Sequence, residues 1–336
     1  GAELYATSNR YGRYQSYGAL EILYDGSTKT GNGYDAETWN WNFNPGTTTI
    51  VLPWDLLHGE KARIDELQEY DFAGALAFKS KKSEALSKTH GTYGIFAMDF
   101  REKENQGFST VYGPNTHNGS FRFKKSAFAF DDAIICLGSD INNNDGNNST
   151  VTTLFQRLDN TSKDVLVNGS TLNASTSFTG ETDNWVMSNY GTGFYVLEGN
   201  DEVKLWNGDQ QTPNQNQINP DAYTGNATDK YWIGHINHGT NPKDAAYEYM
   251  LIPQTNKPEM DRLDAEIKAG NKPYTVHQKN AKAHIIEHKS GVWGYAIFSK
   301  DSIQNNGQVT YVSDPCLIMY EENSLNGKLK IAISNP

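Results

Sequence analysis

The chain has 336 residues, of which 37% are hydrophobic and 21% charged, and its formal net charge is −11. Its length can bury a large core as one domain or two, and its many aromatic, glycine and asparagine residues favour a β-rich fold over a helical one. The acidic charge argues against a nucleic-acid partner, which needs clustered Lys and Arg, and no apolar run reaches the roughly 20 residues of a membrane span.

The first segment with a candidate function is Asn9–Gly18, where Arg10 and Arg13 stand among tyrosines. Arg13 is a candidate substrate-binding residue, because an arginine beside aromatic rings can hold a carboxylate or sulfate or stack on a sugar. An Arg–Tyr stack at a domain surface is the structural alternative, and we favour it. The apolar alternation over residues 20–24 then predicts a strand.

Two tryptophans form the next candidate, in the run WNWN at residues 39–42. In an extended segment Trp39 and Trp41, two positions apart, project to the same side. Together with the amides of Asn40 and Asn42 they would form a platform on which a pyranose ring stacks. Two core tryptophans would look the same in the sequence, so both interpretations stay open. The β-branched residues that follow, over 47–52, predict a strand.

His90 lies just before the strand predicted over Gly91–Phe100. Functional residues often lie where a strand begins, but a lone histidine is more often a surface or hydrogen-bonded residue.

The centre of the chain predicts three strands in sequence, Ser126–Phe130, Ala133–Ile141 and Val151–Gln156, separated by Asp, Asn and Gly. This punctuation favours an antiparallel meander. The second run does not alternate, which indicates burial on both faces and places it in the middle of a large β structure. We expect Cys136, inside this run, to be a free buried thiol.

The remainder of the chain reads as further strands around one helix, Pro258–Ala269, in which a proline lies early, apolar residues recur at helical spacing and Gly270 ends the pattern. Strands are predicted at 165–167, 184–187, 193–197, 203–206, 247–252, 274–277, 284–288, 292–298, 309–312, 316–320 and 329–333, and a long surface loop at 207–230.

No metal site is expected. His235 and His238 lack a third ligand at a fitting spacing, and the asparagine-rich segment 142–148 lacks the terminal Glu of an EF-hand loop.

Five collinear segments resemble the chondroitin-sulfate ABC lyases of polysaccharide lyase family eight: 9–22, 39–53, 124–141, 151–156 and 241–251. The resemblance implies an all-β fold, a large antiparallel β-supersandwich of the galactose mutarotase-like type. Residues 1–336 would be the central domain of a larger lyase, with 1–55 leading in from a missing N-terminal α/α toroid and a sub-boundary near 252–272.

The chemistry that the resemblance implies is β-elimination on a uronic acid, without a cofactor. A base removes the C5 proton, the neighbouring carboxylate is neutralised, and the C4–O bond breaks. The family's catalytic Asn, His, Tyr and Arg are expected upstream of Gly1, so this part alone should be inactive. The family's Glu from the sandwich aligns with His90, with Glu84 as the alternative if the alignment slips. Phe43 replaces an Arg of the chondroitin lyases.

Three hypotheses follow. The chain is the β domain of a secreted or periplasmic lyase acting on chondroitin or dermatan sulfate, with hyaluronan as a further candidate. Alternatively it is a carbohydrate-binding module that uses Trp39 and Trp41, or a scaffold that only supports the toroid. The expected partners are an acidic polysaccharide and the toroid.

Overall fold

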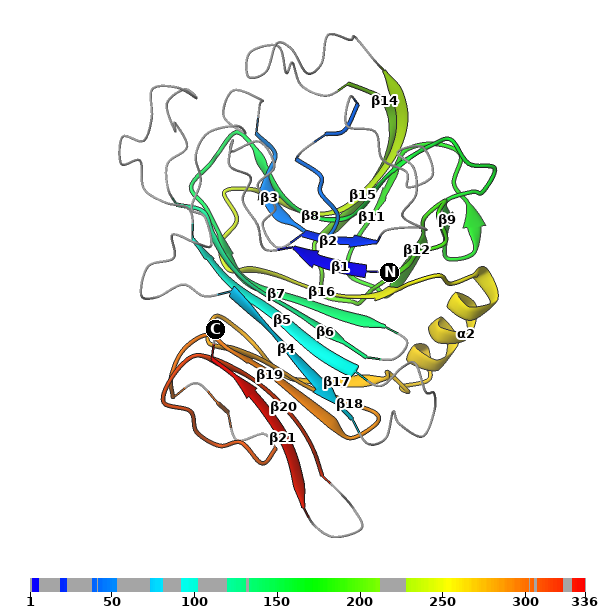
Figure 1. Cartoon of the computed structure of the whole chain (residues 1–336). Helices are drawn as coiled ribbons and strands as arrows, with labels where there is room; N and C mark the ends of the chain where they lie inside the picture. The colour runs from blue at the N-terminus through cyan, green and yellow to red at the C-terminus, as the bar shows by residue number, and fades with distance from the viewer. Residues whose placement is uncertain are drawn as a thin grey trace, which may run out of the picture.

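The structure is a computed structural model that describes residues 2–5, 19–22, 38–40, 42–52, 73–80, 92–101, 120–130, 133–211, 228–301, 303–304, 307–322 and 328–335. These residues form three large antiparallel sheets and one separate hairpin, β1 (Ala2–Tyr5) with β2 (Ala19–Ile22). The large sheets lie in layers, which we name the upper, middle and lower sheets from their places in Figure 1.

The middle sheet has nine strands and the other two have five each in this part of the chain. Across the middle sheet the order is β10 (Ser170–Thr171), β9 (Leu166–Val167), β12 (Asn184–Met187), β13 (Gly193–Val196), β16 (Ala245–Ile252), β7 (Ile134–Asn142), β6 (Arg122–Ala129), β5 (Thr92–Arg101) and β4 (Ala73–Lys79). The upper sheet runs β11 (Thr176–Phe178), β14 (Glu202–Gln210), β15 (Asp229–Thr240), β8 (Ser149–Leu158) and β3 (Thr48–Ile50). The lower sheet runs β17 (Tyr274–Lys279), β18 (Ala283–His288), β19 (Val292–Ile297), β20 (Cys316–Glu322) and β21 (Leu329–Ser334).

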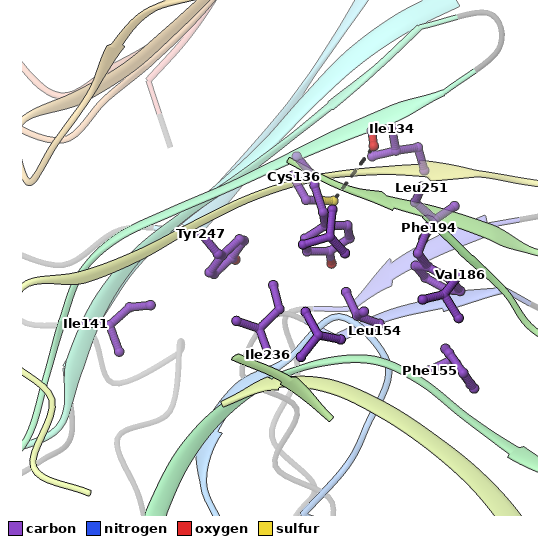
Figure 2. Close-up of a cluster of buried hydrophobic side chains, with 14 of the residues drawn as sticks. Ile134, Cys136, Ile141, Leu154, Phe155, Val186, Phe194, Ile236, Tyr247 and Leu251 are labelled. Carbon is purple, nitrogen blue, oxygen red and sulfur yellow. Dashed lines mark hydrogen bonds between the residues drawn. The ribbon is translucent and has the colours of Figure 1, made fainter. Parts of the chain in front are cut away.

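β7, in the middle sheet, is buried on both faces, as the sequence predicts for this strand. Cys136 belongs to the upper core, between the upper and middle sheets, whereas Ile135 and Leu137 belong to the lower core, between the middle and lower sheets. Figure 2 shows part of the upper core, where Tyr247 and Leu251 lie together with Cys136. Cys136 is a free thiol, and burial raises its pKa to about 11.

The predicted three-strand meander is wrong in its last step. β6 and β7 pair as expected, with Ala127 opposite Cys136, but the second neighbour of β7 is β16. β8 pairs instead with β15 and β3 in the upper sheet. The connecting loop takes the chain from one sheet to the other, and Asp145 holds it by accepting the backbone N–H groups of Asn147 and Asn148 at 2.8 and 2.9 Å. Turn residues mark the end of a strand but not the sheet that receives the next one.

Two other strand predictions need correction. β14 and β15 pair from Glu202–Asn237 to Gln210–Asp229, so both ends of the predicted loop 207–230 are strand. The predicted strand 309–312 is not one, since no strand is assigned between 307 and 315. β14 pairs with β15 along its whole length, but its polar outward side chains hide the strand in the sequence, because period-2 hydrophobicity is weak where one face is polar.

Helix α2 (Lys257–Lys268) confirms the predicted helix and connects the middle sheet to the lower sheet. Met260 and Ile267 bury its apolar face in the lower core. Its first turn is capped by Asn256, whose side-chain oxygen accepts the backbone N–H of Glu259 at 3.1 Å.

Replacing this cap tests how much α2 contributes. Asn256→Ala should lower the free energy of unfolding by about 1 kcal/mol, because the Glu259 N–H loses its partner. Urea denaturation measures the change. Asn256→Asp, which keeps a capping oxygen, is the matched control and should stay close to the unmodified protein.

Candidate functional site

A cavity of about 740 Å³ lies on the outer face of the upper sheet. Along β15, Ile233 and His235 line it, whereas Trp232 and Ile236 point the other way into the upper core. Strand alternation therefore turns one side of this sheet to the upper core and the other side to the cavity and to the smaller core cluster around Trp39. The remaining walls come from β14, from residues 175–177 at β11 and from Asn40 and Phe43 of the segment before β3.

Aromatic side chains form one wall. A Cβ atom on Gly208 would lie 2.5 Å from Cζ2 of Trp206, so the indole rests against a strand position that has no side chain. The rings of Phe43 and His235 lie 5.3 Å apart between centroids, at a 40° tilt. These rings give the cavity flat apolar surfaces of the kind that ligand sites use for affinity.

Two amides tie the segment around Asn40 to the upper sheet. The Gln156 side chain accepts the backbone N–H of Asn40 at 3.0 Å and a hydrogen bond from Gln210 Nε2 at 2.7 Å. Gln210 Oε1 and His235 Nδ1 are buried, and neither has a hydrogen-bond partner among the described residues. An unpaired buried polar atom is costly, so this part of the wall carries two unfavourably placed polar atoms.

The described lining carries little charge. Lys204 Nζ lies 3.4 Å from a carboxylate oxygen of Glu202, and the hydroxyl of Ser177 is the main cause that lowers the pKa of that carboxyl. Burial, with smaller effects of Lys204 and His238, lowers the pKa of His235 to about 4, so its ring is neutral at pH 7. With Asp209, the described walls hold one lysine and two carboxylates, a net charge of −1.

The comparison with known families decides what kind of domain carries this cavity. The model of the super-sandwich domain of polysaccharide lyase family 8 matches residues 1–264. The chain belongs to polysaccharide lyase family 8. The three-layer antiparallel architecture agrees with this assignment and confirms the predicted supersandwich.

Its relatives in the family are longer proteins. The super-sandwich chain is 31% identical over 323 residues to the chondroitin sulfate ABC endolyase of Proteus vulgaris, covering 95% of this chain and 29% of the relative. It is 30% identical over 352 residues to the chondroitin sulfate ABC exolyase of Bacteroides thetaiotaomicron, covering 100% of this chain and 30% of the relative. The chain thus spans about three tenths of the length of these relatives.

Solved structures show the same fold. A chondroitinase AC lyase matches 98% of this super-sandwich chain and 43% of its own, with a TM-score of 0.68 and 24% identity. A Paenibacillus xanthan lyase matches 99% of this chain and 30% of its own, with a TM-score of 0.70 and 20% identity. In the described part of the chain, no helix has the length and apolar character to cross a membrane.

In the super-sandwich domain, the segment that carries the predicted sugar platform is not in the extended conformation assumed from the sequence. The Phe43 N–H donates to the Asn40 carbonyl at 3.0 Å, so the segment turns. Trp39 is 1% exposed, donates its ring N–H to Asn44 Oδ1 at 2.8 Å and packs edge-on against Tyr231. This position favours the core interpretation of Trp39.

The two asparagines of the platform lie in different surroundings. Asn42 is buried and exchanges hydrogen bonds of 2.9 and 3.0 Å with the backbone of Leu52, which makes it a structural residue. Asn40 lines the cavity. Trp41 and Arg13 lie outside the described residues, so their proposed roles stay predictions.

His90 and Glu84 also lie outside the described residues. The described residues that flank this stretch belong to the middle and lower sheets: Lys79 pairs with Thr92 in the middle sheet, and Ser80 Oγ donates to Glu321 of the lower sheet at 2.6 Å. The structure therefore brings Asn40 together with Trp206 and His235, but not with the strand that follows His90.

The cavity residues Trp206 and Gln210 are absent from the site predicted from sequence. The alternation of Lys204 and Trp206 along one strand was the available signal, but it does not tell which face of the sheet is covered. His235 and His238, considered together for a metal, lie on opposite sides of β15: His238 stacks on Tyr247 of the middle sheet and bonds Asp201 at 2.7 Å. No group of three metal-ligating side chains occurs among the described residues.

Proposed function

We propose that this chain is the central β domain of a lyase that cleaves a uronic-acid polysaccharide of the chondroitin type by β-elimination. The observation that carries the proposal is the identity of 31% and 30% to two chondroitin sulfate ABC lyases over 95% and 100% of the chain. We further propose that an N-terminal α/α toroid in the parent protein supplies the catalytic residues, and that the parent acts on its polysaccharide in a secreted or periplasmic form.

The cavity supports a role in holding the glycan rather than in the chemistry. Elimination needs a base whose pKa suits the working pH and a group that neutralises the carboxylate. His235, with a pKa of about 4, is a weak base at neutral pH, and Lys204 is already paired with Glu202. Trp206 and Phe43 instead offer surfaces for the C–H faces of sugar rings, and Asn40 and Gln210 offer amides for hydroxyl groups.

A scaffold without any glycan contact is the second candidate function. The burial of Trp39 and Asn42 favours it, because these two residues of the predicted platform serve the fold. The aromatic rings of Trp206 and Phe43 in the cavity wall favour glycan binding instead.

The activity of the full-length parent tests the lyase proposal. Incubated with chondroitin, dermatan sulfate and hyaluronan, it should release unsaturated uronate, seen by its ultraviolet absorbance, whereas residues 1–336 alone should release none. Folded full-length protein that leaves all three polymers intact would contradict the proposal.

His90→Ala in the same assay tests the separate prediction that His90 replaces the family's Glu: a large loss of turnover with intact folding supports it, and unchanged turnover removes it.

A further inference from the structure

The charges and surfaces of the upper-sheet cavity bear on which sugar of the polymer it holds. We infer that the cavity binds the neutral N-acetylhexosamine ring, without a sulfate at the contacting face, and rejects the uronate ring. This inference rests on the proposed function in one respect, that the ligand is a glycan of alternating uronate and N-acetylhexosamine.

The charge of the cavity walls disfavours an anionic sugar. A uronate carboxylate or a sulfate brings a negative charge to walls whose described residues already carry a net −1, from Glu202, Asp209 and Lys204. Lys204 is the one cation among these described residues, and its Nζ lies 3.4 Å from a carboxylate oxygen of Glu202. An anionic sugar must therefore compete with a neighbouring carboxylate for this lysine, and like charges at close range disfavour binding.

The second step concerns His235, the other group that could become cationic. Its ring packs at 5.3 Å from Phe43, and Nδ1 is buried without a partner among the described residues. A protonated ring would bury its charge against an apolar neighbour, which is costly without a counter-ion. The neutral ring offers a hydrogen bond but no charge, which suits a hydroxyl or an amide better than a carboxylate.

The shape and chemistry of the other walls complete the fit. Trp206, resting on Gly208, and Ile233 provide apolar surface for the C–H face of a ring and for an acetamido methyl group. The side-chain amide of Asn40, which lines the cavity, can hydrogen-bond an acetamido group. Aromatic, aliphatic and amide groups are thus all present, as recognition of an N-acetylated sugar requires. The volume of about 740 Å³ falls within the ~300–1,000 Å³ of typical ligand sites.

Binding of single sugars to the 336-residue protein tests the inference. The probes are the methyl glycosides of N-acetylgalactosamine, of glucuronic acid and of N-acetylgalactosamine 4-sulfate, titrated by ligand-observed NMR at low and at high salt. The neutral hexosamine should bind about tenfold more tightly than either anion, a difference of about 1.4 kcal/mol. Added salt should narrow that difference by screening the repulsion.

Variants locate the binding. Trp206→Ala should abolish hexosamine binding. Gly208→Ala, which pushes the indole away from the strand, should weaken it at least fivefold and serves as the second variant if Trp206→Ala fails to fold. Glu202→Gln should reduce the ratio of neutral-sugar affinity to anionic-sugar affinity, because it removes one negative charge from the wall. Tyr311→Ala is the control: Tyr311 is an exposed aromatic residue outside the cavity, and its replacement should leave all affinities unchanged.

Two results would overturn the inference: tighter binding of glucuronate or of the sulfated sugar than of the neutral one, or hexosamine binding that survives both Trp206→Ala and Gly208→Ala. Both are distinct from failure of the lyase proposal. If the full-length protein degrades chondroitin but the cavity prefers an anionic sugar, only the inference about the cavity is refuted. If the cavity binds the neutral sugar but the full-length protein has no lyase activity, only the lyase proposal is refuted.

Discussion

Acidification below pH 6.5 is expected to destabilise the domain through His284. This side chain is 0% exposed, between the middle and lower sheets, and its two ring nitrogens lie 2.7 Å from Ser126 Oγ and 2.8 Å from Ser139 Oγ. Burial, followed by the charges of Lys279 and Lys124, lowers the pKa of His284 from 6.5 to about 3. The folded protein therefore holds the ring neutral at a pH where the unfolded chain protonates it.

The sign follows from proton linkage. The contribution of His284 is fully present above pH 6.5, and it is lost as the pH falls towards 3, because the unfolded state then binds one more proton. The slope is about 1.4 kcal/mol of unfolding free energy per pH unit in this window.

Urea unfolding at several pH values between 7 and 4 measures this slope. Carboxylates add their own dependence, so the test is the difference between variants. His284→Gln should be less stable at pH 7, since it cannot fill the same space, but its stability should fall less steeply with acid. His277→Gln is the control, because His277 is partly exposed beside Glu287 and should keep the full slope. Equal slopes in all three proteins would remove His284 as the cause.

Gly138→Ala should cost about 1–3 kcal/mol of stability, because β7 has no room for a side chain at this position. Gly138 pairs with Tyr247 across β7 and β16, and an added Cβ would lie 2.0 Å from Cε1 of the Tyr247 ring. Tyr247 is 1% exposed in the upper core, so its ring cannot swing aside into solvent.

Thermal or urea denaturation measures the cost, and Gly146→Ala is the matched control because nothing lies within 4 Å of its added Cβ. A double-mutant cycle isolates the clash: in a Tyr247→Ala background, Gly138→Ala should cost little. If the two substitutions instead add, the crowding at Tyr247 is not what destabilises Gly138→Ala.

The elements of the fold could be predicted largely from local pattern. The unbroken apolar run of β7 requires two cores, and the spacing of Met260 and Ile267 requires a helix with one buried face. Both are properties of neighbouring residues. The transfer of β8 to the upper sheet is not, because its partners β15 and β3 come from distant parts of the chain, and no local signal reports which edge is free.

The candidate site was less accessible to prediction for the same reason. Trp39 and Trp206 are both aromatic residues among polar neighbours. Trp39 is buried because Leu158 and Tyr231, far away in sequence, pack on it, whereas Trp206 lines the cavity. Among the described residues of the predicted platform, Asn40 alone lines the cavity, because the turn before β3 carries it to the outer face of the upper sheet.

We propose that the outer face of the upper sheet holds the glycan for cleavage. Kinetics of the full-length parent on chondroitin test it most directly, with wild type compared against Trp206→Ala and against Tyr311→Ala, whose aromatic ring is 65% exposed. Loss of one stacking surface should lower kcat/KM about tenfold in Trp206→Ala, mainly through KM, since about 1.4 kcal/mol of binding is removed. Tyr311→Ala should match wild type. Unchanged kcat/KM in folded Trp206→Ala would contradict the claim and leave the domain as a scaffold.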